Sequence, residues 1–486
     1  MLFNSLNFLL FFLGMCIIYY ATPQKSKWII MLAASIGFYM CFNPLHVAIL
    51  LFVTAVSYFA GLMVYNDRKK GKKIILTVGV ILSLAFLVLG KYADFLMQNI
   101  YKVLDLLKIP YSVSNIKFIL PVGISFFTFK AVSYIVDAYR GKIVEKNFLK
   151  YLLYVSFFPQ IASGPIERST NLIPQFSEEH KFNPKMVEKG LCLMLVGFFK
   201  KMVVADNISG VVSKVFADAD MYSPLVLFGI ACVYSLQIFC DFSGYSDIAI
   251  GCTQVLGIKT VPNFNNPYFA KTIAEFWRKW HISLSSWFKD YLYIPLGGNR
   301  KGTVRKYVNL MIVFLVSGLW HGSSWNFIFW GFLHGIYQII GALTSNLREK
   351  VCKVIRIDRN EKLHDFFKII ITFVLVTFAW IFFKADSIQS GFNYIKCMFS
   401  NNFDTMNLRA IIASVKMLFN SKTTLISFAV AICTFIPFMF LDYKKDFCEF
   451  MSKRHTVTKI IFFALFIAFI VIFASTNVTD FIYIRF

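Results

Sequence analysis

The chain has 486 residues, of which 57% are hydrophobic and 56 are phenylalanine. Because a soluble domain cannot bury so much apolar surface, the composition excludes a soluble globular protein and predicts a polytopic membrane protein. The net charge of +24 comes from Lys and Arg residues in short loops between apolar runs, where they orient helices, so nucleic-acid binding is not indicated.

The N-terminal part of the chain predicts five membrane-spanning helices. The apolar runs cover residues 2–21, 28–42, 46–65, 74–98 and 116–138. No basic segment precedes the first run, so we expect a retained helix rather than a signal peptide. Three basic segments, around Lys25, at 67–73 and at 140–150, are predicted to be cytosolic, which places the N-terminus outside.

Residues 151–258 predict kinked or re-entrant segments. Prolines and charged residues interrupt the apolar runs 151–166, 190–205 and 222–258, namely Pro159, Pro165, Lys200, Lys201, Asp206, Asp241 and Asp247. Such breaks are tolerated at membrane depth only where the backbone is buried in protein or lines a cavity. We therefore expect these segments to surround a central chamber.

Two carboxylates stand inside the last of these runs, where residues 241–247 read Asp-Phe-Ser-Gly-Tyr-Ser-Asp. A carboxylate in hydrocarbon requires a partner. We expect Asp241, Ser243, Tyr245 and Asp247 to form a structural polar core paired with Lys or Arg, while a direct functional role is the alternative.

Residues 272–275, Thr-Ile-Ala-Glu, have the capping-box pattern and predict a helix through about residue 289. Trp277 and His281 would share one face of this helix, which we expect to lie in the cytosolic interface and to close the floor of the chamber. The alternative is that His281 only bonds a neighbouring backbone group. The following Pro-Leu-Gly-Gly-Asn-Arg at 295–300 predicts a turn, or a close approach to a phosphate.

Two uncharged runs, Tyr307–Leu319 and Trp325–Leu343, flank a histidine. The first run of 13 residues is only ~20 Å long, too short for the ~30 Å hydrocarbon core. Because both ends of the pair are basic, we predict a hairpin whose apex holds His321 part way across the membrane, between the helix breakers Gly318 and Gly322. An ionisable group there is a functional candidate, although a histidine bonded to a carbonyl or lying at the outer interface is the alternative.

The C-terminal part predicts three more spans, at 366–385, 423–441 and 458–475, with the segment 387–422 outside. By the same count the C-terminus lies outside. With no internal repeat or linker, we predict one membrane domain of roughly 11 to 13 spans over residues 1–486. Its core is 116–345, between the N-terminal helices of 1–115 and the C-terminal helices of 346–486.

Short motifs rich in aromatic and polar residues are spread over nearly the whole chain. They stand at residues 121–129, 164–166, 241–247, 264–268, 275–285, 290–300, 318–322 and 481–486. Together they resemble the membrane-bound O-acyltransferase family, in particular its bacterial alginate-acetylation branch. Departures are small: Lys279 and Lys289 stand where arginine is common, and Phe127 where tyrosine is common.

The resemblance implies an all-α polytopic fold, in which a ring of transmembrane, kinked and interfacial helices surrounds a thinned centre. The family's near-invariant histidine falls on His321 and its second polar position on His281. His321 is then the candidate general base for acyl transfer from a thioester to a hydroxyl, and His281 supports it by bonding the thioester carbonyl or holding the donor. The candidate donor-binding residues are Trp277, Lys279, Trp320 and Asn299.

The implied enzyme is an O-acyltransferase of the bacterial cytoplasmic membrane that serves O-acetylation of an exported or cell-surface polysaccharide. Its donor substrate would be acetyl-CoA or another acyl thioester, with no bound cofactor. Its partners would be an extracytoplasmic acetyltransferase or esterase-like protein, the polysaccharide biosynthesis machinery and the lipid bilayer. D-alanyl transfer to teichoic acid from a carrier-protein thioester is one alternative, and a transporter or flippase without ester chemistry is another.

Two residue types complete the candidate chemistry. The ten cysteines form no C-x-x-C pair and no cluster at metal-ligand spacing, so we predict no metal site. Tyr483, near the C-terminus, is either part of an aromatic belt at the membrane surface or a covalent acyl relay. A phenol has a pKa of about 10, so its ester is a better acyl donor than a sugar ester.

Overall fold

The computed structural model describes residues 1–66, 71–112, 120–400, 407–475, 479 and 481–482. Across these residues the regular structure is helical and contains no strand, which confirms the all-α class. The chain divides into two compact units, one made of Met1–Leu191 with Ile248–Val261 and the other of Cys192–Asp247 with Pro262–Ile482.

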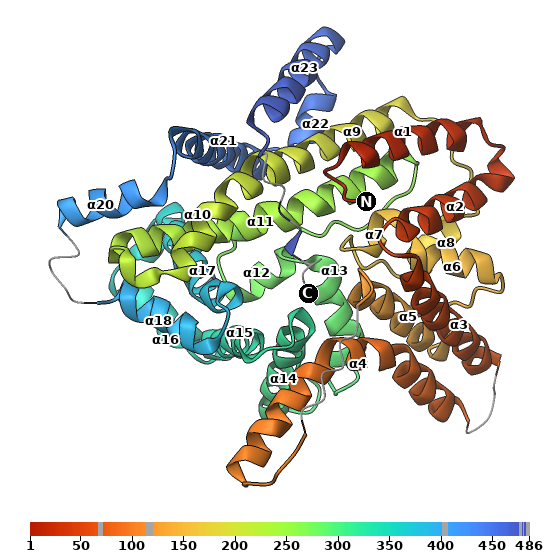
Figure 1. Ribbon diagram of the computed structural model, residues 1–486, viewed down its shortest axis with the longest axis horizontal. Helices are drawn as coiled ribbons and strands as arrows, with labels where there is room; N and C mark the ends of the chain where they lie inside the picture. Colours follow the sequence, from red (N-terminus) through yellow and green to blue (C-terminus); the bar gives the residue numbers. More distant parts are fainter. Residues whose placement is uncertain (67–70, 113–119, 401–406, 476–478, 480, 483–486) are drawn as a thin grey trace. The chain divides into compact units, whose positions relative to one another are not determined.

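The first unit is built around α3 (Pro44–Asn66), which packs against both α4 (Lys72–Leu106) and α5 (Ile124–Tyr139) (Figure 1). With 35 residues, α4 is roughly 52 Å long and extends well beyond the expected run 74–98. The other helices up to residue 175 are α1 (Leu6–Ala21), α2 (Lys27–Met40), α6 (Phe148–Ser156), α7 (Phe158–Ile161) and α8 (Ser169–Gln175), with the 3₁₀ turn η1 (Gln24–Ser26).

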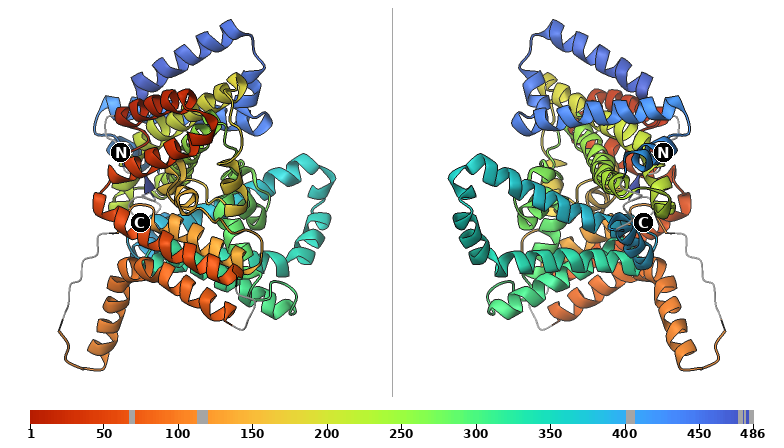
Figure 2. Two further views of the ribbon diagram at one scale, coloured as in Figure 1. Left: turned by 90° about the vertical axis from the view of Figure 1, so that its right-hand side faces the viewer. Right: turned by 90° about the vertical axis from the view of Figure 1, so that its left-hand side faces the viewer.

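The second unit contains the histidines and the polar segments singled out above. Its most extensively packed pair of described helices is α14 (Thr303–His321) and α15 (Trp325–Leu343). In Figure 2, the chain leaves α15, passes through α16 (Ser345–Val354) and returns as α17 (Glu361–Lys384), which packs against α15.

The remaining helices include two π-helices, η2 (Phe199–Ala205) and η5 (Lys289–Tyr293). The 3₁₀ turns are η3 (Ala219–Met221), η4 (Pro267–Phe269) and η6 (Ile357–Arg359). The α-helices are α9 (Pro184–Phe198), α10 (Asp206–Ala217), α11 (Pro224–Val255), α12 (Ile273–Lys279), α13 (Ile282–Phe288), α18 (Ile388–Met398), α20 (Leu408–Leu418), α21 (Lys422–Lys444), α22 (Phe447–Ser452) and α23 (Thr456–Phe473).

Seven helices in the described part of the chain are long and apolar enough to cross a membrane: α3, α4, α11, α15, α17, α21 and α23. The chain is therefore a multi-pass membrane protein. The number is below the 11 to 13 spans expected because several predicted runs form shorter helices, such as α2 with 14 residues and α5 with 16. In α23 only 6% of the apolar window is buried by protein, which is typical of a lipid-facing helix.

Candidate functional site

The helix pair α14 and α15 is held together by contacts that only glycine allows. A Cβ atom at Gly318 would lie 2.3 Å from the Phe327 carbonyl oxygen, and one at Gly331 would lie 2.2 Å from the Phe314 carbonyl oxygen. Gly318 was expected to break the helix, but α14 continues through it to His321 and ends at Gly322. The prediction was wrong because Gly318 serves the close approach of two backbones rather than a break.

His321 ends α14 among packed aromatic side chains and is only 2% exposed. Its ring centroid lies 4.9 Å from that of Trp320, 5.0 Å from that of Trp330 and 5.4 Å from that of Phe383. The side chain of Asn326 donates to the carbonyl oxygen of Ala385 at 2.7 Å, which ties the start of α15 to the end of α17. Three helices therefore fix the surroundings of this imidazole.

His281 lies at a break where one continuous helix was expected. Thr272 caps α12 as predicted, since its hydroxyl accepts from the Glu275 N–H at 3.0 Å. However, α12 ends at Lys279, and His281 has the left-handed backbone conformation with φ +44° before α13 begins. The prediction of one helix through residue 289 was wrong because the preceding loop pairs with the break: the Ile282 N–H donates to the Asn263 carbonyl at 2.9 Å. Left-handed non-glycine residues are costly and concentrate at functional sites.

Asn263 also fixes the proton on His281. The Asn263 Oδ1 atom accepts from the Ser283 hydroxyl at 2.9 Å and from the Ser283 N–H at 3.4 Å, while its Nδ2 donates to the Ser246 hydroxyl at 3.1 Å. The His281 Nδ1 atom lies 3.0 Å from the same Oδ1 and must therefore donate to it. The neutral imidazole then carries its lone pair on Nε2. Burial lowers the pKa of His281 to about 3, so this neutral form prevails at physiological pH.

The structure brings the two predicted histidines to the same indole. The Trp320 ring centroid lies 4.9 Å from that of His321 and 6.0 Å from that of His281. Phe242 of α11 packs edge-on against His281, with 4.6 Å between centroids. His281, His321 and the predicted donor-binding Trp320 therefore belong to one buried aromatic cluster, which we call the histidine pocket.

A third histidine of this site, the buried His334 on α15, was not singled out from the sequence. Its Nδ1 atom accepts from the Trp277 indole N–H at 3.2 Å, so its own proton lies on Nε2. Its ring centroid is 5.0 Å from that of Trp330, which also contacts His321. The signal in the sequence was its spacing of 13 residues after His321 in an apolar helix, but spacing alone cannot distinguish a site histidine from a buried one. Predicted donor-binding Trp277 reaches the pocket through this contact.

The other two predicted donor-binding residues, Lys279 and Asn299, lie in more exposed surroundings than Trp277 and Trp320. Lys279 is half-buried and pairs with Glu275 at 2.8 Å, one turn earlier on α12. Burial alone would raise the pKa of the Glu275 carboxyl, but its hydrogen bonds with Lys279 and the Lys271 N–H outweigh burial and lower it. Asn299 is exposed in the turn after η5, where Gly297 and Gly298 have positive φ, so this segment is a turn as expected.

The carboxylates of the 241–247 segment face lysines, as buried charges require. Lys201 pairs with Asp241 at 2.6 Å and with Asp206 at 2.9 Å, and Lys200 pairs with Asp247 at 2.7 Å. Both lysines belong to the π-helix η2. The hydroxyl of Ser243 is buried without a hydrogen-bond partner among the described residues, and the Tyr245 ring packs against Phe481 with 4.5 Å between centroids.

The remaining predictions concern Tyr483 and metal binding. Tyr483, the predicted relay, lies outside the described residues. Within the described ranges, no group of three His, Cys, Asp or Glu side chains is placed to hold a metal ion.

Comparison with known proteins shows similarity along most of the chain. The family model described as MBOAT, membrane-bound O-acyltransferase family, matches residues 31–385. A probable alginate O-acetylase AlgI of Azotobacter vinelandii is 35% identical over 405 residues, which are 82% of this chain and 78% of that protein. A peptidoglycan O-acetyltransferase of Helicobacter pylori is 34% identical over 80% of this chain and 77% of its own length. A teichoic acid D-alanyltransferase of Bacillus subtilis is 30% identical over 54% of this chain and 68% of its own length.

Proposed function

Because the chain belongs to the membrane-bound O-acyltransferase family and is an O-acyltransferase, we propose that it moves an acetyl group from a cytosolic thioester, acetyl-CoA, across the bacterial cytoplasmic membrane. The acetyl group is then used to O-acetylate an exported or cell-surface polysaccharide, with an extracytoplasmic acetyltransferase completing the transfer. Relatives named as alginate and peptidoglycan O-acetyltransferases support a glycan as the final acceptor.

We assign the reacting groups from one observation: the buried imidazoles of His281 and His321 both pack against the Trp320 indole. His321 is the general base in this proposal. It takes the proton of the attacking hydroxyl while the oxygen bonds to the thioester carbonyl carbon. The carbon–sulfur bond then breaks, and the leaving thiolate takes the proton from the imidazolium. An aromatic, water-poor pocket disfavours hydrolysis of the thioester by competing water.

The sequence suggested that His281 donates a hydrogen bond to the thioester carbonyl, but we assign it a different role. With its proton on Nδ1 bonded to Asn263, the neutral ring has no N–H to offer at Nε2. We therefore assign to His281 the acceptor role: its Nε2 lone pair orients the hydroxyl or the thiol group in the pocket. Trp277 and Trp320 line the same pocket and are assigned to donor binding, while Lys279 and Asn299 stay assigned to the donor side.

Tyr483 is the proposed relay that carries the acetyl group as an aryl ester to the external transferase. Its phenol oxygen would attack the thioester as described for a hydroxyl, and the sugar hydroxyl would later displace it. The test is mass spectrometry of the C-terminal peptide in a strain that lacks the external partner. An added acetyl mass is expected, and its absence together with full glycan acetylation in Tyr483→Phe would refute the relay.

The general-base assignment is tested by His321→Ala in membranes supplied with acetyl-CoA. We expect transfer to fall by about 10²-fold or more at normal expression, because a positioned base contributes that much. His455→Ala is the matched control, since His455 is exposed before α23 and caps it without a side-chain hydrogen bond. Retained transfer in His321→Ala would contradict the assignment. Supplying a D-alanyl carrier-protein thioester instead of acetyl-CoA distinguishes the two donor classes.

A further inference from the structure

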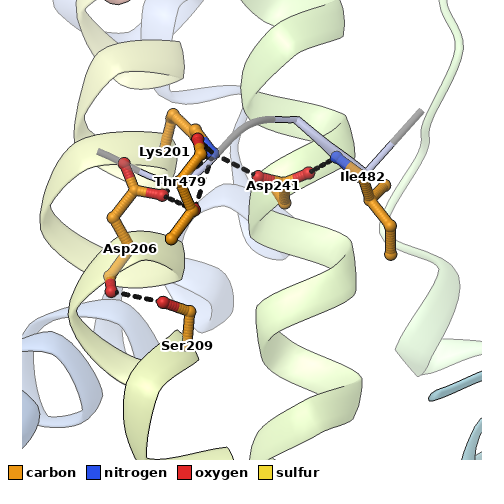
Figure 3. Close-up of polar contacts among 6 residues, drawn as sticks. All are labelled: Lys201, Asp206, Ser209, Asp241, Thr479 and Ile482. Atoms are coloured by element: carbon orange, nitrogen blue, oxygen red, sulfur yellow. Dashed lines mark hydrogen bonds and ion pairs between the residues drawn. The ribbon is translucent and has the colours of Figure 1, made fainter. Parts of the chain in front are cut away.

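The polar cluster around Lys201 holds the last described residues of the chain (Figure 3). The Lys201 ammonium donates to the Thr479 carbonyl oxygen at 2.9 Å, and the Thr479 hydroxyl donates to Asp206 at 2.5 Å. Three residues later, the Ile482 N–H donates to Asp241 at 2.9 Å. The segment is thus bound through its backbone at two points, as a peptide ligand is.

Phe481 gives this segment an aromatic anchor. The side chain is 2% exposed, and the Lys201 ammonium lies 4.4 Å from the centroid of its ring, which is cation–π geometry. Tyr245, one turn after Asp241 on α11, meets the same ring edge-on at 4.5 Å. Two residues of the 241–247 motif therefore contact the C-terminal segment, and neither role was visible in the sequence.

The charges of the cluster show why it needs this ligand. One ammonium, on Lys201, faces two carboxylates, Asp206 and Asp241. The Thr479 hydroxyl and the Ile482 N–H supply the additional donors that the two carboxylates accept. Without the segment, two buried carboxylates would share a single cation and lose these bonds, which is unfavourable.

Helix α11 connects this cluster with the histidine pocket. Asp241 and Tyr245, four residues apart, lie on one face and contact the C-terminal segment. Phe242 and Ser246, also four residues apart, lie on the neighbouring face and contact His281 and Asn263. The segment is therefore anchored one residue along α11 from a side chain that touches His281.

We propose that Lys201, Asp206, Asp241 and Tyr245 form a docking site for the C-terminal segment of this same chain, with Phe481 as its anchor. Docking fixes Phe481 and Ile482 against α11, the helix whose Phe242 touches His281. The docking itself follows from the contacts above, whereas its consequence, presentation of Tyr483 to the histidine pocket, rests on the proposed function.

Docking is tested by carboxypeptidase digestion of the full-length protein in detergent, with mass spectrometry to follow the loss of Ile482 and Phe481. In Asp241→Asn, the amide presents only one acceptor oxygen to two donors, the Lys201 ammonium and the Ile482 N–H. Phe481→Ala removes the anchor without touching the ion pairs, so it stays informative if the first variant does not fold. Asp247→Asn is the matched control, because it breaks the neighbouring pair with Lys200 on the same helix.

We expect both test variants to lose Ile482 about tenfold faster than the control, because trimming follows the population of undocked segment. Equal trimming in Phe481→Ala, Asp247→Asn and the wild type would overturn the docking site. The outcome is separate from the relay: protected Ile482 with full acetylation in Tyr483→Phe would keep the docking site and reject the relay.

Discussion

The hydrogen bond between Asn263 and His281 allows a chemical role of His281 to be distinguished from a structural one. Replacing Asn263 with Leu removes the acceptor for His281 Nδ1 and for the hydroxyl and N–H of Ser283. Loss of this hydrogen bond destabilises the tautomer protonated on Nδ1 by about 1–3 kcal/mol relative to the tautomer protonated on Nε2. Because about 1.4 kcal/mol is a factor of ten, the ratio of the tautomer with its lone pair on Nε2 to the other tautomer falls by roughly an order of magnitude.

We therefore expect kcat for acyl transfer in Asn263→Leu to fall at least about tenfold with little change in KM for acetyl-CoA. Asn263→Asp replaces the donation to Ser246 with a second acceptor oxygen and adds a carboxylate, but it keeps an acceptor for His281 Nδ1, so its kcat should lie much closer to that of the wild type than the kcat of Asn263→Leu. The assay is thiol release from acetyl-CoA coupled to product acetylation in proteoliposomes, analysed by mass spectrometry.

The control is Asn309→Leu. Asn309 is equally buried, and its side chain donates to the carbonyl oxygens of Leu296 and Gly298. It holds a turn and no imidazole, so the loss of a buried amide there should reduce stability rather than kcat. Wild-type kcat in folded Asn263→Leu, or equal losses in the Leu and Asp variants at position 263, would refute the tautomer argument.

Gly318→Ala should lower Tm by the equivalent of about 1–3 kcal/mol, because its Cβ would lie 2.3 Å from the Phe327 carbonyl oxygen. The control Gly341→Ala has open space around the new Cβ and should leave Tm unchanged. Equal Tm values for the two variants would argue against the close packing of α14 and α15. In a cysteine-free background, Lys25→Cys should be shielded from an impermeant thiol reagent in intact cells and Lys422→Cys should react; the reverse pattern would invert the topology. The lowered pKa of His281 means that the unfolded chain binds the extra proton below about pH 6.5, so acidification to pH 5 should cost about 2 kcal/mol of stability. His281→Asn should lose less stability than the wild type over that interval, and an identical loss would show that His281 does not contribute.

The sequence predicted features that depend on local pattern and on the cost of burying charge. The run 46–65 appears as α3 over Pro44–Asn66 because its length and apolar character suffice to define a span. Asp241 and Asp247 find lysine partners because an unpaired carboxylate is not tolerated in such surroundings. Burial of His321 follows in the same way from two apolar runs that meet at one residue.

Features that depend on distant residues could not be predicted. The break at His281 is held by Asn263, 18 residues earlier, and no local rule excludes a continuous helix there. The partner of the Asp241 carboxylate at Ile482 is 241 residues away, so the motif around Asp241 could be recognised as important without its ligand being identifiable. In both cases the missing information is tertiary contact, which overrides helix propensity.

The two lysines of η2 have a consequence for motion. Lys200 and Lys201 are neighbours in sequence, yet their partners Asp247 and Asp241 are six residues apart, roughly 9 Å along α11. The side chains must diverge to reach them, so any sliding of η2 along α11 would lengthen one ion pair while it shortened the other. We therefore expect η2 and this part of α11 to move as one rigid body during turnover. Conformational change should then occur in segments that are not joined by such a pair of diverging ion pairs.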